Sequence, residues 1–237
     1  EAADAVIAGA DIVDAKEPRN GALGIMPLNS LKEVINLVRH KKKFSGKLTA
    51  TLGDYFHNVR EEELNLNYFL MGVDAIKIGF NASGSIYSEE TFKHFCNVFE
   101  DFVKVHQKVN PNVNVCKIVP VLLVDDGLKT GFVDFIMKSP IANNFMGIML
   151  DTKSKKKNNI FDILSISYLG SILRKFESLK IPYGISGSLS FADSNTIKEL
   201  RPHWAGFRGG VCTHGRNGKL SKSKILLLKN ALKFSQQ

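Results

Sequence analysis

Charged side chains stand at the ends of several short apolar segments, where they could act together in catalysis. The first segment carries Asp14 and Lys16, and later segments carry Lys77, Asp151 and Arg208. A lysine that is desolvated and close to another cation has a lowered pKa and can attack a carbonyl carbon to form a Schiff base. A nearby aspartate can then move a proton as the imine becomes an enamine. These residues predict carbonyl chemistry at a lysine, provided that the fold brings them together.

A second group of residues could bind phosphate. Arg208 is followed directly by Gly209 and Gly210, and another glycine-rich stretch spans residues 215–218. Glycines allow backbone N–H groups to approach an anion closely. Because both stretches follow the last expected strand, the pattern indicates a phosphate site at that end of the sheet.

Short apolar segments alternate with stretches of helical spacing along the whole chain. We expect strands at residues 11–16, 47–52, 74–80, 115–124, 145–151, 182–186 and 203–208. Apolar strands of this kind are typical of parallel sheets covered by helices. The predicted fold is therefore an α/β TIM (β/α)8 barrel, whose first strand we expect upstream of Glu1 because only seven are visible. An open doubly wound sheet is the alternative, although no GxGxxG motif opens a helix after a strand.

The alternation of side chains along each strand predicts where the charged residues point. Every second residue of a barrel strand faces the interior. The inward positions near the C-terminal ends of the expected strands include Asp14, Lys16, Lys77, Asp151 and Arg208. Barrel enzymes have their active sites at that end, so we expect one shared cleft. Ion pairs within the set could instead have only a structural role.

Composition limits the other classes of protein. With 237 residues, 44% of them hydrophobic, and no linker-like segment, the chain is expected to form a single domain over residues 1–237. No apolar run approaches the roughly 18 residues of a membrane span. The three cysteines form no CxxC motif and the histidines are dispersed, so we expect no metal and a cytoplasmic protein. The net charge of +9 fits a solvated basic surface or a site for anionic small molecules.

Several motifs resemble one enzyme family over essentially the whole chain. Residues 8–24, which contain Asp14 and Lys16, resemble the opening motif of the (5-formylfuran-3-yl)methyl phosphate synthases of methanofuran biosynthesis. Further matches follow in the same order at residues 49–54, 75–79, 149–152, 161–162, 186–189 and 206–210. The first motif is highly specific, so the resemblance is not a matter of barrel periodicity alone.

The resemblance implies a cofactor-free barrel lyase that joins two molecules of glyceraldehyde 3-phosphate into a furan aldehyde phosphate, with loss of phosphate and water. It implies that Lys16 forms the Schiff base and that a second catalytic lysine falls at Lys155. The matched positions that complete the expected active site are Asp14, Lys77 and Asp151. The residues expected to bind substrate or its phosphate are Ser186, Gly187, Ser188, Arg208, Gly209 and Gly210.

Two other functions remain open at this point. A different Schiff-base aldolase acting on a phosphorylated sugar would use the same lysines. A non-catalytic barrel could bind nucleic acid or a protein through its basic face, with the strong salt dependence of such binding. We expect a small phosphorylated partner, rather than nucleic acid or a membrane, and leave self-association into a homo-oligomer open.

Overall fold

The computed structural model describes residues 1–55, 65–154 and 159–233. Each of its seven strands overlaps a segment expected from the sequence, and the second and third run on to Asp54 and Asn81, beyond the expected ends at 52 and 80. The strands are β1 (Ile12–Ala15), β2 (Lys47–Asp54), β3 (Ala75–Asn81), β4 (Lys117–Leu123), β5 (Ile148–Asp151), β6 (Tyr183–Ile185) and β7 (Trp204–Ala205). The helices are α1 (Ala2–Ile7), α2 (Leu28–Ile35), α3 (Ile86–Val109), α4 (Thr130–Met137), α5 (Ile160–Ile163), α6 (Ile166–Ser178), α7 (Ser194–Leu200) and α8 (Lys222–Leu232).

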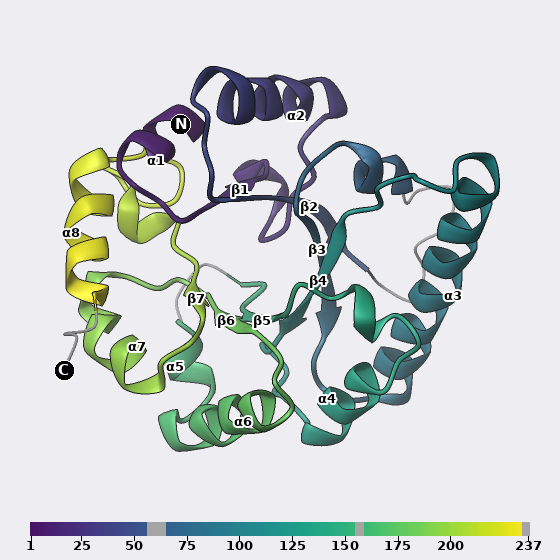
Figure 1. The fold of residues 1–237 in the computed structure, drawn as a ribbon. Helices are drawn as coiled ribbons and strands as arrows, with labels where there is room; N and C mark the ends of the chain where they lie inside the picture. The colour runs from purple at the N-terminus through teal and green to yellow at the C-terminus, as the bar shows by residue number, and fades with distance from the viewer. Residues whose placement is uncertain (56–64, 155–158, 234–237) are drawn as a thin grey trace.

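The strands form one parallel sheet whose spatial order follows the chain from β1 to β7. Figure 1 looks along the axis of this curled sheet, with the helices arranged around its outside. A doubly wound sheet would reverse its strand order part-way, so the consecutive order confirms the barrel-type α/β fold and rejects that alternative.

The ring of helices is continuous where the sheet is open. Within the residues described, β7 and β1 share no strand pairing. At this place α1 packs between α8 and the helical segment that continues α2, as Figure 1 shows. An additional strand upstream of Glu1 stays a prediction.

Two separate hydrophobic cores confirm the expected alternation of side chains. Val13, Ile76 and Leu150 belong to the larger core, which lies between the sheet and the helices. Val119 and Met149 belong to the smaller core, which fills the interior of the curled sheet. Successive side chains of a strand therefore face different cores, as the period of two requires.

Helix α3 contributes the aromatic stripe expected from its sequence. The Ser85 hydroxyl caps the helix by accepting a hydrogen bond from the backbone N–H of Ser88. Phe92, Phe95 and Phe99 are all buried, and Phe92 meets Phe80 of β3 edge to face at a centroid distance of 5.0 Å. The stripe is part of the core, so α3 supports β3, which carries Lys77.

The last strand is shorter than the sequence indicates. The expected segment 203–208 contains only Trp204–Ala205 as strand, and the chain then turns into a short 3-10 helix at Gly209–Val211. The glycines at 206, 209 and 210 favour this turn over a continued strand. Arg208 therefore lies in a loop beyond β7 and is not the last inward residue of a strand.

The described part of the chain has no helix that is both long and apolar enough to span a membrane.

Gly147, which precedes β5, provides a test of the packing between strands. A Cβ at this buried position would lie 2.3 Å from the carbonyl oxygen of Pro182, which accepts the hydrogen bond from the N–H of Ile148. Gly147→Ala should therefore lower the free energy of unfolding by about 2 kcal/mol through overpacking and the displaced carbonyl. Urea titration measures this loss. Gly131→Ala on α4 is the matched control and should cause no loss, because a Cβ added there would meet no neighbouring atom within 4 Å.

Candidate active site

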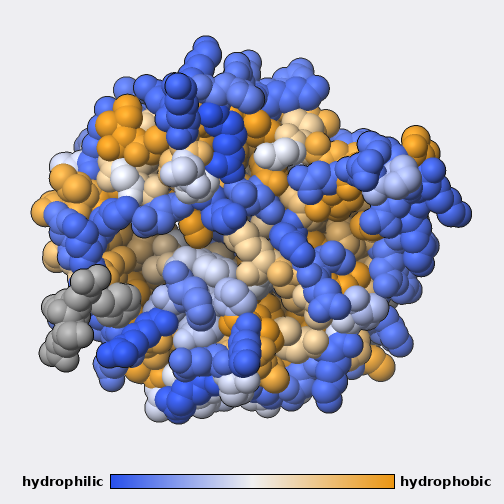
Figure 2. Space-filling view, in the orientation of Figure 1, coloured by the Kyte–Doolittle hydropathy of each residue, from blue (hydrophilic) through white to orange (hydrophobic). Residues whose placement is uncertain are grey.

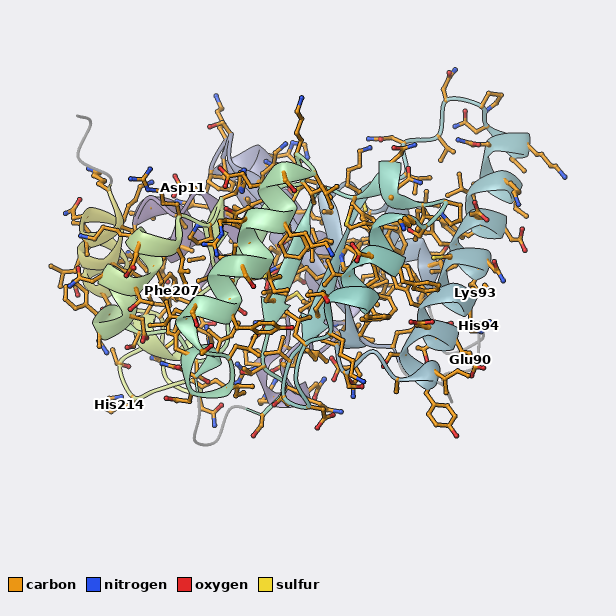
Figure 3. The ribbon with its side chains drawn as sticks, turned by 90° about the horizontal axis from the view of Figure 1, so that it is seen from below. Asp11, Glu90, Lys93, His94, Phe207 and His214 are labelled. Atoms are coloured by element: carbon orange, nitrogen blue, oxygen red, sulfur yellow. The ribbon has the colours of Figure 1, made fainter. Side chains whose placement is uncertain are left out.

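The charged residues gather at the C-terminal ends of the strands. Figure 3 shows the barrel from the side, with Asp11, just before β1, at one end and His214, in the loop after β7, at the other. Asp14 on β1 and Lys77 on β3 both point into the interior toward the His214 end, where the Lys77 Nζ lies 3.1 Å from an Asp14 carboxylate oxygen. The structure thus brings together residues 63 positions apart in the sequence, as the alternation predicts.

Asp14 is held as a carboxylate by three neighbours. Besides Lys77, the Lys16 Nζ lies 3.8 Å from Asp14, and the Thr49 hydroxyl donates a hydrogen bond of 2.6 Å to it. Burial acting alone would raise the pKa of Asp14, but the charges of Lys77 and Lys16 and these hydrogen bonds outweigh it and lower the pKa. Asp14 is therefore negatively charged at neutral pH.

Lys16 occupies a site that favours its neutral amine. Its side chain is only 17% exposed, and its Nζ donates a hydrogen bond of 3.3 Å to the carbonyl oxygen of Ala22. Burial lowers the pKa of Lys16, and the positive charges of Lys77 and Arg216 act in the same direction, whereas the negative charges of Asp14 and Asp151 oppose it. A larger fraction of Lys16 is consequently unprotonated and nucleophilic at neutral pH than for a surface lysine.

Asp151 ends β5 and reaches the same cleft. Its side chain is buried, and one carboxylate oxygen accepts a hydrogen bond of 2.7 Å from the backbone N–H of Thr152. Its charge raises the pKa values of both Lys16 and Arg216, which places it among the site residues. The other lysine expected in this loop, Lys155, lies outside the described residues, so its place in the site stays a prediction.

A cavity of about 970 Å³ opens along the gap between β7 and β1. Its polar lining at the C-terminal end includes Asp14, Lys16, Lys77, Asp151, Arg208 and Arg216. Its apolar lining includes Val119, Met149 and Trp204 from the interior core. Figure 2 looks at the opposite end of the barrel, where Asp11 lies and the strands begin, and there the surface is hollowed between the centre of the molecule and α8. The charged cluster lines the same cavity.

The residues expected to contact substrate from β6 also line this cavity. Ser186, Gly187 and Ser188 follow the strand, and Gly187 has a φ of +113° that glycine adopts without strain. A Cβ on Gly187 would lie 2.9 Å from the Thr152 side chain. The absence of a side chain at 187 thus lets the loops after β5 and β6 pack together beside Asp151.

Arg208, Gly209 and Gly210 line the cavity as well, but the Arg208 guanidinium is already paired. Its two terminal nitrogens donate to the carboxylate of Glu1 at 3.0 and 3.2 Å, and its Nε donates to the backbone oxygen of Arg216 at 3.1 Å. Arg208 therefore joins α1 to the loop after β7. Its charge is largely neutralised by Glu1.

Arg216 is a site residue that the sequence alone did not single out. Its guanidinium reaches across the open side of the sheet and donates a hydrogen bond of 2.5 Å to the carbonyl oxygen of Gly21, in the loop after β1. The glycines at 215 and 218 mark the stretch as a turn with room for an anion. They do not indicate where the arginine side chain points, because that depends on a contact 195 positions away along the chain.

Comparison with known proteins shows the family of the chain. The family model described as 4-HFC-P synthase matches residues 1–229 of the chain. The chain belongs to this family. A (5-formylfuran-3-yl)methyl phosphate synthase from Methanococcus aeolicus is 29% identical over 231 residues, covering 96% of this chain and 92% of the relative. The corresponding protein from Methanocaldococcus jannaschii is 26% identical, covering 98% and 95%.

Solved structures support the fold of this 4-HFC-P synthase family member. A phosphoribosyl anthranilate isomerase from Thermus thermophilus superimposes with a TM-score of 0.57 at 10% identity, covering 98% of this chain and 94% of the other. A 3-hexulose-6-phosphate synthase superimposes with a TM-score of 0.58 at 14% identity, covering 98% and 91%. At such low identity these likenesses concern the fold alone.

The charge of Lys77 gives a prediction for how the chemical modification of Lys16 depends on pH. Lys77→Met removes a cation that lowers the pKa of Lys16 and leaves Asp14 to act on Lys16 without a competitor, so both changes raise the pKa of Lys16. The rate at which an amine-directed acylating reagent modifies Lys16 should then fall at neutral pH, and its pH profile should shift to the alkaline side. Peptide mass mapping across a pH series measures this rate. Lys93→Met on the outer helix α3 should leave the profile unchanged (Figure 3).

Proposed function

We propose that this protein condenses two molecules of glyceraldehyde 3-phosphate into (5-formylfuran-3-yl)methyl phosphate through a Schiff base on Lys16. Membership of the 4-HFC-P synthase family supports the product class. The single structural observation that carries the mechanism is the buried amine of Lys16, which has a lowered pKa and lies 3.8 Å from Asp14. A nucleophilic amine beside a carboxylate is the arrangement that imine chemistry requires.

The reaction begins with attack of the neutral Lys16 amine on the carbonyl carbon of one triose phosphate. Loss of water from the addition product gives the imine, which acts as an electron sink. Removal of a proton from the adjacent carbon then gives an enamine, and Asp14, Asp151 or Lys155 assists this transfer. The enamine carbon attacks the aldehyde of the second triose phosphate to form the new carbon–carbon bond. Cyclisation and elimination of phosphate and water form the aromatic furan, and hydrolysis of the imine releases the aldehyde and restores the Lys16 amine.

The dimensions and charge of the cavity suit two such substrates. A volume of about 970 Å³ is at the upper end of the range of roughly 300–1,000 Å³ for small-molecule sites. The apolar wall at Val119 and Met149 faces the charged mouth. Exclusion of water by that wall favours imine formation and strengthens the electrostatic interactions of Asp14 with the lysines.

Incubation of the protein with glyceraldehyde 3-phosphate tests this function. Half of the reaction is scanned for the absorbance of a furan aldehyde, and half is reduced with borohydride and mapped by peptide mass. We expect the chromophore together with a reduced adduct on Lys16. An adduct without the chromophore would overturn the synthase in favour of an aldolase that uses the same lysine. Neither signal from folded protein would overturn Schiff-base chemistry altogether.

A further inference from the structure

Two arginines lie at the mouth of the cavity, and only one of them carries an unneutralised charge. Arg208 is paired with the Glu1 carboxylate through both terminal nitrogens. Arg216 forms one side-chain hydrogen bond among the described residues, to the neutral carbonyl of Gly21. A backbone carbonyl leaves the charge of a guanidinium uncompensated and most of its five N–H donors available.

Arg216 is also close to the reacting amine. Its partner carbonyl belongs to Gly21, and the next residue, Ala22, supplies the carbonyl that accepts from the Lys16 amine. Two consecutive carbonyls in the loop after β1 therefore accept hydrogen bonds from the two side chains, one from each. The positive charge of Arg216 accordingly lowers the pKa of Lys16. Burial lowers the pKa of Arg216, while the charge of Asp151 opposes that effect.

We infer that Arg216 binds the phosphate of the triose whose carbonyl carbon reacts with Lys16, an inference that rests on the proposed function. A triose phosphate brings a dianion that would compensate the charge of Arg216 and a carbonyl carbon that the Lys16 amine would attack. The planar guanidinium can donate two parallel hydrogen bonds to phosphate oxygens, which a lysine cannot do. Arg216 and Lys16 both line the cavity, so one bound triose phosphate could reach both residues.

This inference gives Arg216 a role in selecting phosphorylated aldehydes. Arg208 then has a structural role, since its bidentate pair with Glu1 holds the loop that carries Arg216 and its Nε binds the Arg216 backbone oxygen. Gly209 packs against the same loop, since a Cβ there would make an ordinary contact with the backbone nitrogen of Arg216 at 3.6 Å.

The test compares two aldehydes that differ only in the phosphate. Initial rates of borohydride-trapped adduct on Lys16 are measured with glyceraldehyde 3-phosphate and with glyceraldehyde, each with and without inorganic phosphate as competitor. The variants are Arg216→Gln, Arg216→Lys and Lys219→Gln, the last being an exposed lysine of the same loop. Each variant is measured at the pH of its own maximal rate, because loss of the Arg216 charge also raises the pKa of Lys16.

For Arg216→Gln we expect the half-saturating concentration of glyceraldehyde 3-phosphate to rise about 10- to 100-fold and inhibition by inorganic phosphate to weaken in parallel. The adduct rate with glyceraldehyde should stay within about twofold of the original protein, and Arg216→Lys should restore binding only partly. Lys219→Gln should change neither aldehyde. Equal losses with both aldehydes would overturn the inference and leave Arg216 as a structural link between two loops, and so would no loss with either.

Failure of the inference is separable from failure of the proposed function. The furan chromophore of the original protein reports the synthase reaction, whereas the phosphate dependence of the Lys16 adduct reports Arg216. A protein that forms the adduct with phosphate selectivity but no furan would retain the role of Arg216 and lose the synthase. A protein that forms furan without any contribution from Arg216 would retain the synthase and lose the role of Arg216.

Discussion

Replacement of Lys16 by alanine is expected to abolish both the furan product and the borohydride-trapped adduct. The amine is the nucleophile of the proposed mechanism. Without it no imine can form, and the carbanion has no electron sink to stabilise it. A loss of at least about 1,000-fold in kcat is expected, as for removal of other covalent nucleophiles. Product absorbance and peptide mass mapping on the same sample measure the two losses together.

Two further variants are controls, one for the positive charge of Lys16 and one for the loss of a lysine elsewhere. Lys16→Arg keeps a cation beside Asp14 but has no amine that loses its proton near neutral pH, so it should be as inactive as Lys16→Ala while preserving the pairing. Lys93→Ala, on the outside of α3, removes an exposed lysine and should leave activity intact. Near-normal turnover by folded Lys16→Ala would refute the mechanism. Folding is checked by far-UV circular dichroism and a urea titration.

Much of the fold follows from local sequence patterns. The alternation of apolar strands and amphipathic helices predicts all seven strand positions. The period of two along β1 and β3 places Asp14 and Lys77 on the inner face, and their ion pair of 3.1 Å confirms that they meet. These features depend on the pleat of a strand and on the shared direction of parallel strands, both of which can be deduced from the sequence.

The sequence patterns do not predict the conformation and contacts of the loops. The segment 203–208 reads as a strand, yet only Trp204–Ala205 pairs with β6, because pairing ends where the glycine-rich turn begins. The partner of Arg208 is Glu1, 207 positions away, and the partner of Arg216 is Gly21. Such contacts depend on how loops from opposite ends of the chain meet, and no local period or motif specifies them. The sequence therefore predicts the lysine that we propose as nucleophile, whereas the residue that we assign to the substrate phosphate follows only from the structure.

Asp14→Asn is expected to have the second largest effect, on stability as well as on activity. The substitution keeps the shape of the side chain but removes the counter-charge of Lys77 and Lys16, whose side chains are only 11% and 17% exposed. Leaving buried cations unpaired costs about 3 kcal/mol in the free energy of unfolding. Loss of the carboxylate beside the imine should also lower kcat by about 100-fold or more. Urea titration and the furan assay measure these two losses.

The pH dependence of stability gives a distinct signature. Because the pKa of Asp14 is lower in the folded protein than its ordinary value of 3.8, its charge stabilises the fold above that pH. This stabilisation is lost as the pH falls below 3.8 toward the folded-state pKa. The difference in unfolding free energy between the original protein and Asp14→Asn should therefore be constant near neutral pH and shrink in acid.

A double-mutant cycle identifies the interaction responsible. Combining Asp14→Asn with Lys77→Met removes the stranded cation, so the double variant should be more stable than the sum of the single losses predicts, by about 1–2 kcal/mol. Asp11→Asn is the control, because Asp11 is 82% exposed and pairs with Lys229 at the opposite end of the barrel, where the expected loss is below about 1 kcal/mol. Strict additivity at 14 and 77 would show that Asp14 does not stabilise the lysine cluster.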